Sequence, residues 1–128
     1  RGLDGVVTFL PFVPDVMPVL RALVAVVMPS LWEAAGLLAM EALVAGTPLL
    51  TSDCPGLRVV VRDTPARMAP AGDVEAWAAA LESLIATPPV AETQAFVSTA
   101  LERFDADRTA ERTVALLDEV ADRAEQDA

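Results

Sequence analysis

The sequence predicts an α/β fold in which an open parallel sheet is followed by two further helices. Short apolar runs alternate with segments whose apolar residues recur at helical spacing, in the order strand, helix, strand, helix, strand. That order implies parallel strands joined by right-handed crossovers. The length of 128 residues suits a single domain with a real core, and no repeat or linker divides it.

The amino-terminal part of the chain predicts two strands and a helix between them. The apolar run at residues 6–10 is the first strand candidate. Asp15 can cap a helix over residues 16–22, where Pro18 falls in the first turn and is tolerated. The run at residues 25–28 is the second strand candidate.

The middle of the chain continues the same alternation. A helix over Leu37–Ala45 is expected to stop at Gly46, its C-cap, before a strand over residues 47–52. Arg67–Ala69 is a weaker strand candidate, and Asp73 can cap the helix that follows. The apolar face of this last helix is expected to carry Trp77, Leu81, Leu84 and Ile85.

The last third of the chain predicts two charged, amphipathic helices over residues 90–101 and 107–125. Acidic residues are interpreted as their solvated faces. The residues expected on their apolar stripes are Val97, Leu101, Val114, Leu117 and Val120.

The composition argues against several classes of partner and of cellular location. The net charge is −10 and the nine basic residues are scattered, which argues against nucleic acid or an anionic membrane as a partner. Apolar residues make up 54% of the chain, but no stretch approaches the roughly 20 residues of a membrane helix. Cys54 is the only cysteine and histidine is absent. With no signal-peptide pattern in residues 1–30, we expect a cytoplasmic protein.

Two glutamates separated by seven residues bracket a glycine at the start of the central helix. Glu33 precedes Gly36 in the loop, and Glu41 falls about one turn into the helix. Gly36 lets backbone approach a diphosphate closely, Ser30 offers a hydroxyl nearby, and free amides at a helix start attract phosphate. Spacing alone leaves open that both glutamates are solvated acids favoured by the helix macrodipole.

The loops at residues 29–36 and 53–56 are expected to hold the ligand, because ligands of open parallel sheets lie beyond the carboxyl ends of the strands. Residues 32–37 read Trp-Glu-x-x-Gly-Leu and are continued by residues 40–53. This sequence is similar to the signature of retaining GT-B glycosyltransferases of family 4, the glycosyl transferases group 1. The similarity covers residues 5–87, including Pro-Ala-Gly-Asp at residues 70–73.

The resemblance implies a role for each motif residue. Glu33 is the catalytic-site carboxylate against the hexose of a nucleotide-sugar donor, while Glu41 holds the ribose. Backbone amides of Gly36, Leu37 and Leu38 meet the donor diphosphate. Transfer in this family is front-face, and the leaving diphosphate helps to deprotonate the acceptor, so the site needs charge stabilisation more than a nucleophile. The expected donor site is completed by Ser30 and Gly56, with no metal or cofactor implied.

Some residues depart from the family pattern. Ala35 stands where an aromatic residue is usual, which leaves a roomier loop. Of the Gly-Gly pair expected after Asp53, only Gly56 remains. Cys54 lies near the site, but neither a histidine nor a basic cluster adjoins it to form a nucleophilic thiolate. We therefore interpret Cys54 as a space-filling residue.

The resemblance also implies a Rossmann-like sheet that is incomplete. Residues 1–128 match the later part of a carboxyl-terminal donor domain: residues 5–87 form the nucleotide-sugar-binding part and residues 88–128 the terminal helices. In the family strand order 3-2-1-4-5-6, residues 6–10 are the third strand and residues 25–28 the fourth, which are not neighbours. They must pair directly, be exchanged with a second copy, or leave an open edge that invites association. We expect a homodimer, or an upstream domain as partner.

We therefore expect the donor-binding domain of a glycosyltransferase whose acceptor is unknown. The family's diphosphate-clamping Arg and Lys lie upstream of the match, so the isolated chain is expected to be inactive. Membrane contact is expected only through the parent protein. The alternative is a non-catalytic, self-associating interaction or regulatory module on the same half-domain. A sugar-nucleotide epimerase fits poorly, because that chemistry needs acid and base groups and histidine is absent.

Overall fold

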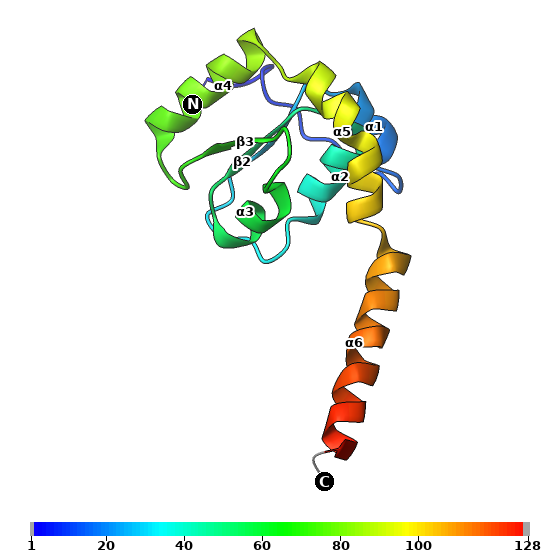
Figure 1. The fold of residues 1–128 in the computed structure, drawn as a ribbon. Helices are drawn as coiled ribbons and strands as arrows, with labels where there is room; N and C mark the ends of the chain where they lie inside the picture. Colours follow the sequence, from blue (N-terminus) through cyan, green and yellow to red (C-terminus); the bar gives the residue numbers. More distant parts are fainter. Residues whose placement is uncertain (1, 127–128) are drawn as a thin grey trace.

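The computed structural model, which describes residues 2–126, has an α/β architecture with a parallel sheet (Figure 1). Its strands are β1 (Val26–Met28), β2 (Leu49–Ser52) and β3 (Arg67–Ala69), hydrogen-bonded in the order β1-β2-β3. In the register of the sheet, Val27 lies opposite Leu50 and Thr51 opposite Met68. All four residues of β2 are buried, as expected for a central parallel strand covered on both faces.

Helices cover both faces of the sheet. The helices described are α1 (Met17–Ala22), α2 (Leu37–Ala45), α3 (Pro55–Val61), α4 (Val74–Ala86), α5 (Val90–Arg103) and α6 (Ala106–Gln126). On one face, α1, α2, α3 and α5 enclose the main core, to which β2 contributes Leu49. On the other face α4 packs on Leu50 and Ala69 through Leu84, so successive β2 residues serve opposite layers. None of the described helices has the combined length and apolarity that a bilayer span requires.

Local sequence signals explain several helix boundaries. Gly46 ends α2 in the left-handed conformation, with a φ of 74°, as its predicted C-cap role requires. The Asp73 side chain caps α4 by accepting a hydrogen bond from the Ala76 amide at 3.0 Å. Helix α1 begins at Met17, one residue later than expected, with Val16 as its N-cap, and the Asp15 carboxylate accepts from the Met17 amide at 3.0 Å.

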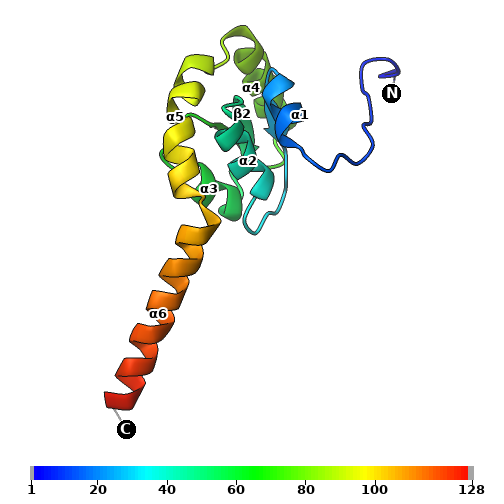
Figure 2. The same ribbon diagram turned by 90° about the vertical axis from the view of Figure 1, so that its right-hand side faces the viewer.

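The strand predicted over residues 6–10 is wrong. Besides local turn hydrogen bonds to the Leu3 carbonyl, the segment makes an isolated bridge between Asp4 and Val7, and Phe9 is 93% exposed. Figure 2 shows this amino-terminal stretch leading away from the α/β body. A strand needs a neighbour for its backbone hydrogen bonds, and no described segment supplies one. The structure therefore excludes direct pairing of residues 6–10 with β1, which lies at an edge of the described sheet.

Three further expectations need correction. Residues 53–56, expected to be a loop, instead lead into helix α3 at Pro55. Ile85 and Leu101 are exposed, because α4 meets the sheet through the side of the helix that carries Leu84 and α5 meets α2 through the side that carries Ala100. Trp77 is half-buried against the α4-side core, and its indole N–H donates to the Pro70 carbonyl at 3.0 Å.

Candidate functional site

Three loops meet at the carboxyl ends of the strands. Loop 29–36 follows β1, residues 53–54 follow β2, and residues 70–73 follow β3. The Ser52 hydroxyl donates to the Ser30 carbonyl at 2.5 Å, which ties the first loop to the end of β2. The Asp53 carboxylate accepts from the Ala71 amide at 2.8 Å, which ties the second to the third. Hydrogen bonds therefore hold the backbone segments together at this edge, where the site was predicted to lie.

The start of α2 presents free backbone amides. Gly36 precedes the helix in the left-handed conformation, with φ and ψ of 54°, and no side chain caps it. The Ala39 and Met40 amides donate to the Gly36 carbonyl at 2.9 and 3.3 Å. In the described part of the chain, the Leu37 and Leu38 amides have no acceptor. These two amides are therefore available to an anion.

Glu33 lies over this helix start. Its side chain is half-buried, and its Cγ atom is 3.6 Å from the point where a Cβ atom on Gly36 would stand. On its other side, that point is only 2.5 Å from the Leu57 Cδ2 atom of α3. Gly36 thus combines a positive φ with a close approach between two elements, and a larger residue does not fit there without rearrangement.

Gly56 has a packing role that sequence reasoning missed. A Cβ atom on Gly56 would lie against the backbone carbonyl oxygens of Glu33 and Ala34, 2.6 Å from the second. The first turn of α3 therefore supports loop 29–36 by direct backbone contact. The expected contact of Gly56 with the donor stays a prediction, and the structure adds that Gly56 packs against the loop that carries Glu33. The available sequence signal was Pro55, since proline is favoured at the first position of a helix and Gly56 then falls in the first turn.

Glu41 lies apart from Glu33. It is exposed on α2, four residues after Leu37, and is the one charged residue lining a cavity of about 210 Å³. This cavity lies between α1, α2 and the end of α5, and Glu33 does not line it. Its lining residues are Met17, Leu37, Met40, Glu41, Val44 and Phe104. The two glutamates therefore flank the helix start from different directions.

Two more side chains stand near this edge. Trp32 is 76% exposed beside Glu33, and such an indole offers a stacking surface to a sugar or a base. Arg58 of α3 donates through Nε to the Asp53 carbonyl and so places a cation at the edge. The sequence pattern did not predict the role of Arg58, because its position depends on helix α3 beginning at Pro55. Cys54 is buried in the core, which confirms its interpretation as a space-filling residue.

A second, larger cavity lies away from this edge. A cavity of about 510 Å³ opens at the amino end of β2, where Arg21, Thr47 and Gln94 contribute polar groups. None of the predicted site residues lines it. Its position opposite the carboxyl edge is not where open parallel sheets bind ligands. It nevertheless provides an internal comparison for any ligand-binding experiment.

The chain is similar to known sugar-transferring proteins. The family model described as glycosyl transferases group 1 matches residues 1–87. A D-inositol 3-phosphate glycosyltransferase of Rhodococcus erythropolis is 40% identical over 114 residues, which cover 86% of this chain and 26% of that protein. The proteins of the same name from Rhodococcus jostii and Mycobacterium avium are 41% and 40% identical over 90 residues, covering 68% of this chain.

The chain spans about a quarter or less of the length of these curated relatives. No solved structure matched the chain.

Proposed function

The chain belongs to the family of glycosyl transferases group 1, and on that premise we propose that it forms the donor-binding half-site of an enzyme that moves a sugar from a nucleoside diphosphate to an acceptor. The observation that carries this proposal is the start of α2, where the free Leu37 and Leu38 amides lie beside the half-buried Glu33. Two amides at the positive end of a helix suit a diphosphate in a protein with a net charge of −10.

The positions of the two glutamates support separate contacts along one donor. Leu37 and Glu41 are neighbours on the α2 surface at a spacing of four residues, about 6 Å along the axis. We assign Glu41 to the vicinal ribose hydroxyls, one turn from the diphosphate. Glu33 folds over Gly36 from the loop, and we assign it to the hexose hydroxyls. In this arrangement the nucleoside and the sugar of the bound donor extend from the diphosphate in different directions.

The proposed chemistry depends on charge stabilisation. As the bond from sugar to diphosphate breaks, negative charge grows on the leaving oxygen, where the Leu37 and Leu38 amides donate hydrogen bonds. The Glu33 carboxylate fixes the hexose as positive charge develops at its anomeric carbon. The acceptor oxygen forms the new bond to the anomeric carbon as the bond to the diphosphate breaks, and its proton passes to the leaving diphosphate. We assign the acceptor site to the remainder of a longer protein and expect the isolated chain to bind donor without transferring sugar.

The names of the relatives suggest the first acceptor to test. The three relatives above are named for D-inositol 3-phosphate. We propose an inositol phosphate as the initial acceptor for a longer protein that contains this chain.

A thermal-shift panel tests donor binding. UDP, GDP, ADP and their sugars are added to the isolated chain, and the matching nucleotide is expected to stabilise it by roughly 2.7 kcal/mol at about 100 times its dissociation constant. Glu41→Ala is expected to weaken binding about tenfold, because the ribose loses a charged hydrogen-bond acceptor. Glu75→Ala, an exposed acid in the first turn of α4, is the matched control and should respond like the wild type. A flat response to every nucleotide contradicts the proposal.

A further inference from the structure

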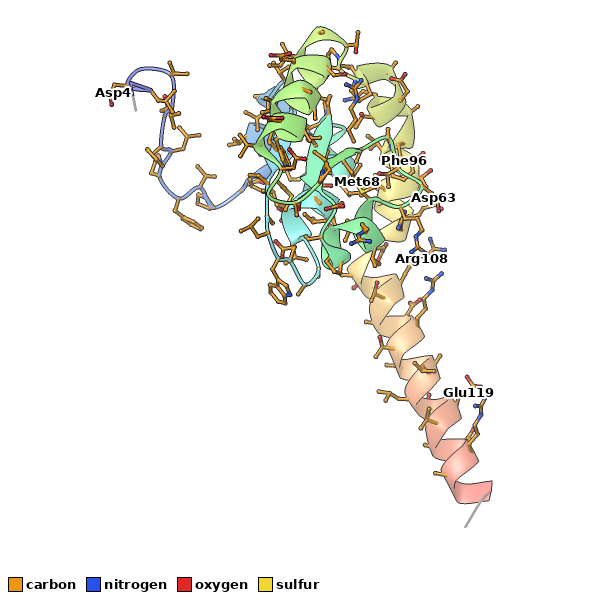
Figure 3. The ribbon with its side chains drawn as sticks, turned by 90° about the vertical axis from the view of Figure 1, so that its left-hand side faces the viewer. Asp4, Asp63, Met68, Phe96, Arg108 and Glu119 are labelled. Atoms are coloured by element: carbon orange, nitrogen blue, oxygen red, sulfur yellow. The ribbon has the colours of Figure 1, made fainter. Side chains whose placement is uncertain are left out.

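Three arginines gather where helix α6 leaves the α/β body. They border a cavity of about 320 Å³ at the end of α5 and the first turns of α6, and Figure 3 shows Arg108 where α6 begins. The residues that line this cavity are Thr99, Glu102, Arg103, Arg108 and Arg112. The nine basic residues are scattered along the sequence, but the fold brings these three to one place in a protein with a net charge of −10.

Arg103 is held in position by the body. Its guanidinium donates to the carbonyl oxygens of Arg62 at 2.7 Å and Val59 at 3.1 Å, at the carboxyl end of α3. The same group lies 5.3 Å from the centre of the Phe104 ring. These hydrogen bonds use two of the five N–H donors of the arginine. The remaining donors have no acceptor among the described residues and are available to a ligand.

Arg108 and Arg112 have no ion-pair partner among the described side chains. Further along the same helix, by contrast, Arg123 forms an ion pair with Glu119. Arg108 and Arg112 are four residues apart and therefore neighbours on the helix surface, where like charges repel each other. Glu102 is the one acid that lines the cavity. A bound anion would therefore neutralise charges that the described residues leave unpaired.

The first turn of α6 is fixed by its own cap. The Asp105 carboxylate accepts hydrogen bonds from the backbone amides of Asp107 and Arg108 at 2.9 and 3.0 Å. Asp105 itself does not line the cavity. Arg103 and Arg108 thus reach the cavity from two backbone segments that hydrogen bonds already hold in place. An anion has only side chains to immobilise there, which lowers the entropic cost of binding.

We propose that this cavity binds the phosphoryl group of a small anion. Three arginines and one glutamate give the lining a net charge of +2, which matches the charge of about −1.5 to −2 on a phosphoryl group at pH 7. The planar guanidinium offers parallel N–H donors that fit two phosphoryl oxygens, and the Thr99 hydroxyl adds a neutral donor. The volume of about 320 Å³ suits a small molecule better than a polypeptide.

An NMR titration with inorganic phosphate tests the cavity. The side-chain resonances of Arg103, Arg108 and Arg112 are expected to shift together, with a dissociation constant of about 1 mM or tighter. Sodium chloride at the same ionic strength should leave them unchanged. The inference does not depend on the proposed donor site, because none of the residues assigned to the donor lines this cavity. Binding at the donor site is read separately in the same spectra, from the Leu37 and Leu38 amides.

One variant and a matched control test the arginines themselves. Arg112→Gln is expected to raise the dissociation constant for phosphate about tenfold, because charge-assisted hydrogen bonds are lost. Arg123→Gln makes the same change on the same helix but outside the cavity, and should bind phosphate like the wild type. Thermal melting of both variants checks that the α/β body is intact. Arginine resonances that do not move at about 10 mM phosphate overturn the proposal, and so does an equal loss of binding in both variants.

Two further ligands identify the source of the phosphoryl group. Glycerol 3-phosphate carries it as a monoester, and tighter binding of this ester than of inorganic phosphate assigns the cavity to a phosphorylated small molecule. Equal or weaker binding of the ester assigns it to free phosphate, and either result supports the proposal. A tetraglutamate peptide offers carboxylates in place of phosphoryl oxygens and is expected to bind more weakly. A cavity that binds the peptide but neither phosphate compound overturns the proposal.

Discussion

Replacing Gly56 with alanine is expected to lower the free energy of unfolding by about 3 kcal/mol, because the added methyl group has no room. It would press on the carbonyl oxygens of Glu33 and Ala34, which are backbone atoms and cannot rotate aside. Helix propensity acts in the opposite direction, since alanine is preferred to glycine within a helix by about 1 kcal/mol. A net loss of stability therefore reports the contact between α3 and loop 29–36.

Urea unfolding measures this effect, and Gly72→Ala provides a matched control. Gly72 has a φ of 80° and more space, since its nearest neighbour is the Leu31 Cδ2 atom at 3.6 Å. Its replacement is expected to cost about 1 kcal/mol of conformational strain alone. The Gly56→Ala variant should also lose its response to nucleotides, because loop 29–36 carries Glu33. A Gly56→Ala protein as stable as the wild type contradicts this account of the loop.

The second large loss of stability is expected when Leu57 and Gly36 are replaced by alanine. Leu57 is fully buried beneath the start of α2, and Leu57→Ala is expected to reduce stability by about 3 kcal/mol through lost contacts and a cavity. Gly36→Ala is expected to reduce it by about 2 kcal/mol, since the residue has a φ of 54° and its new methyl group meets Leu57 at 2.5 Å.

The double variant shows whether the two losses of stability arise from direct contact between positions 36 and 57 or are independent of each other. In Leu57→Ala the methyl group at position 36 enters vacated space, so Gly36→Ala then adds only the strain of its positive φ. The double variant is expected to lose about 1 kcal/mol less free energy of unfolding, or an even smaller amount, than the sum of the two single losses. A double-mutant cycle measured by urea unfolding tests this difference. Strict additivity would mean that α3 does not support the start of α2.

The sequence predicted the parts of the fold that local signals determine. Helix α2 was predicted with its observed bounds, because glycines bracket it, and the Asp73 cap and β3 were also placed correctly. The strand over residues 6–10 failed because pairing is a non-local property that no apolar run contains by itself. Helix α3 was missed because proline and glycine at its start signal a loop, while burial of Leu57 favours the helix.

The candidate site was predictable to a similar extent. The motif spacing correctly placed Gly36 at the start of α2 and Glu41 within it. The contact of Gly56 with loop 29–36 and the contact of Leu57 with Gly36 arise from packing between segments more than 20 residues apart. Such contacts have no local sequence pattern, so they could be read only from the folded chain.

Amide chemical shifts measured by NMR on the 13.5 kDa chain provide the most direct test of the diphosphate site. Titration with the matching nucleoside diphosphate is expected to shift the Leu37 and Leu38 amide resonances most strongly, with smaller shifts at Glu33 and Glu41. The same nucleoside without phosphates should leave the two leucine amides unchanged. Unperturbed Leu37 and Leu38 amides at saturating diphosphate, or shifts centred on Arg21 and Gln94 at the opposite end of the sheet, would contradict a donor site at the start of α2.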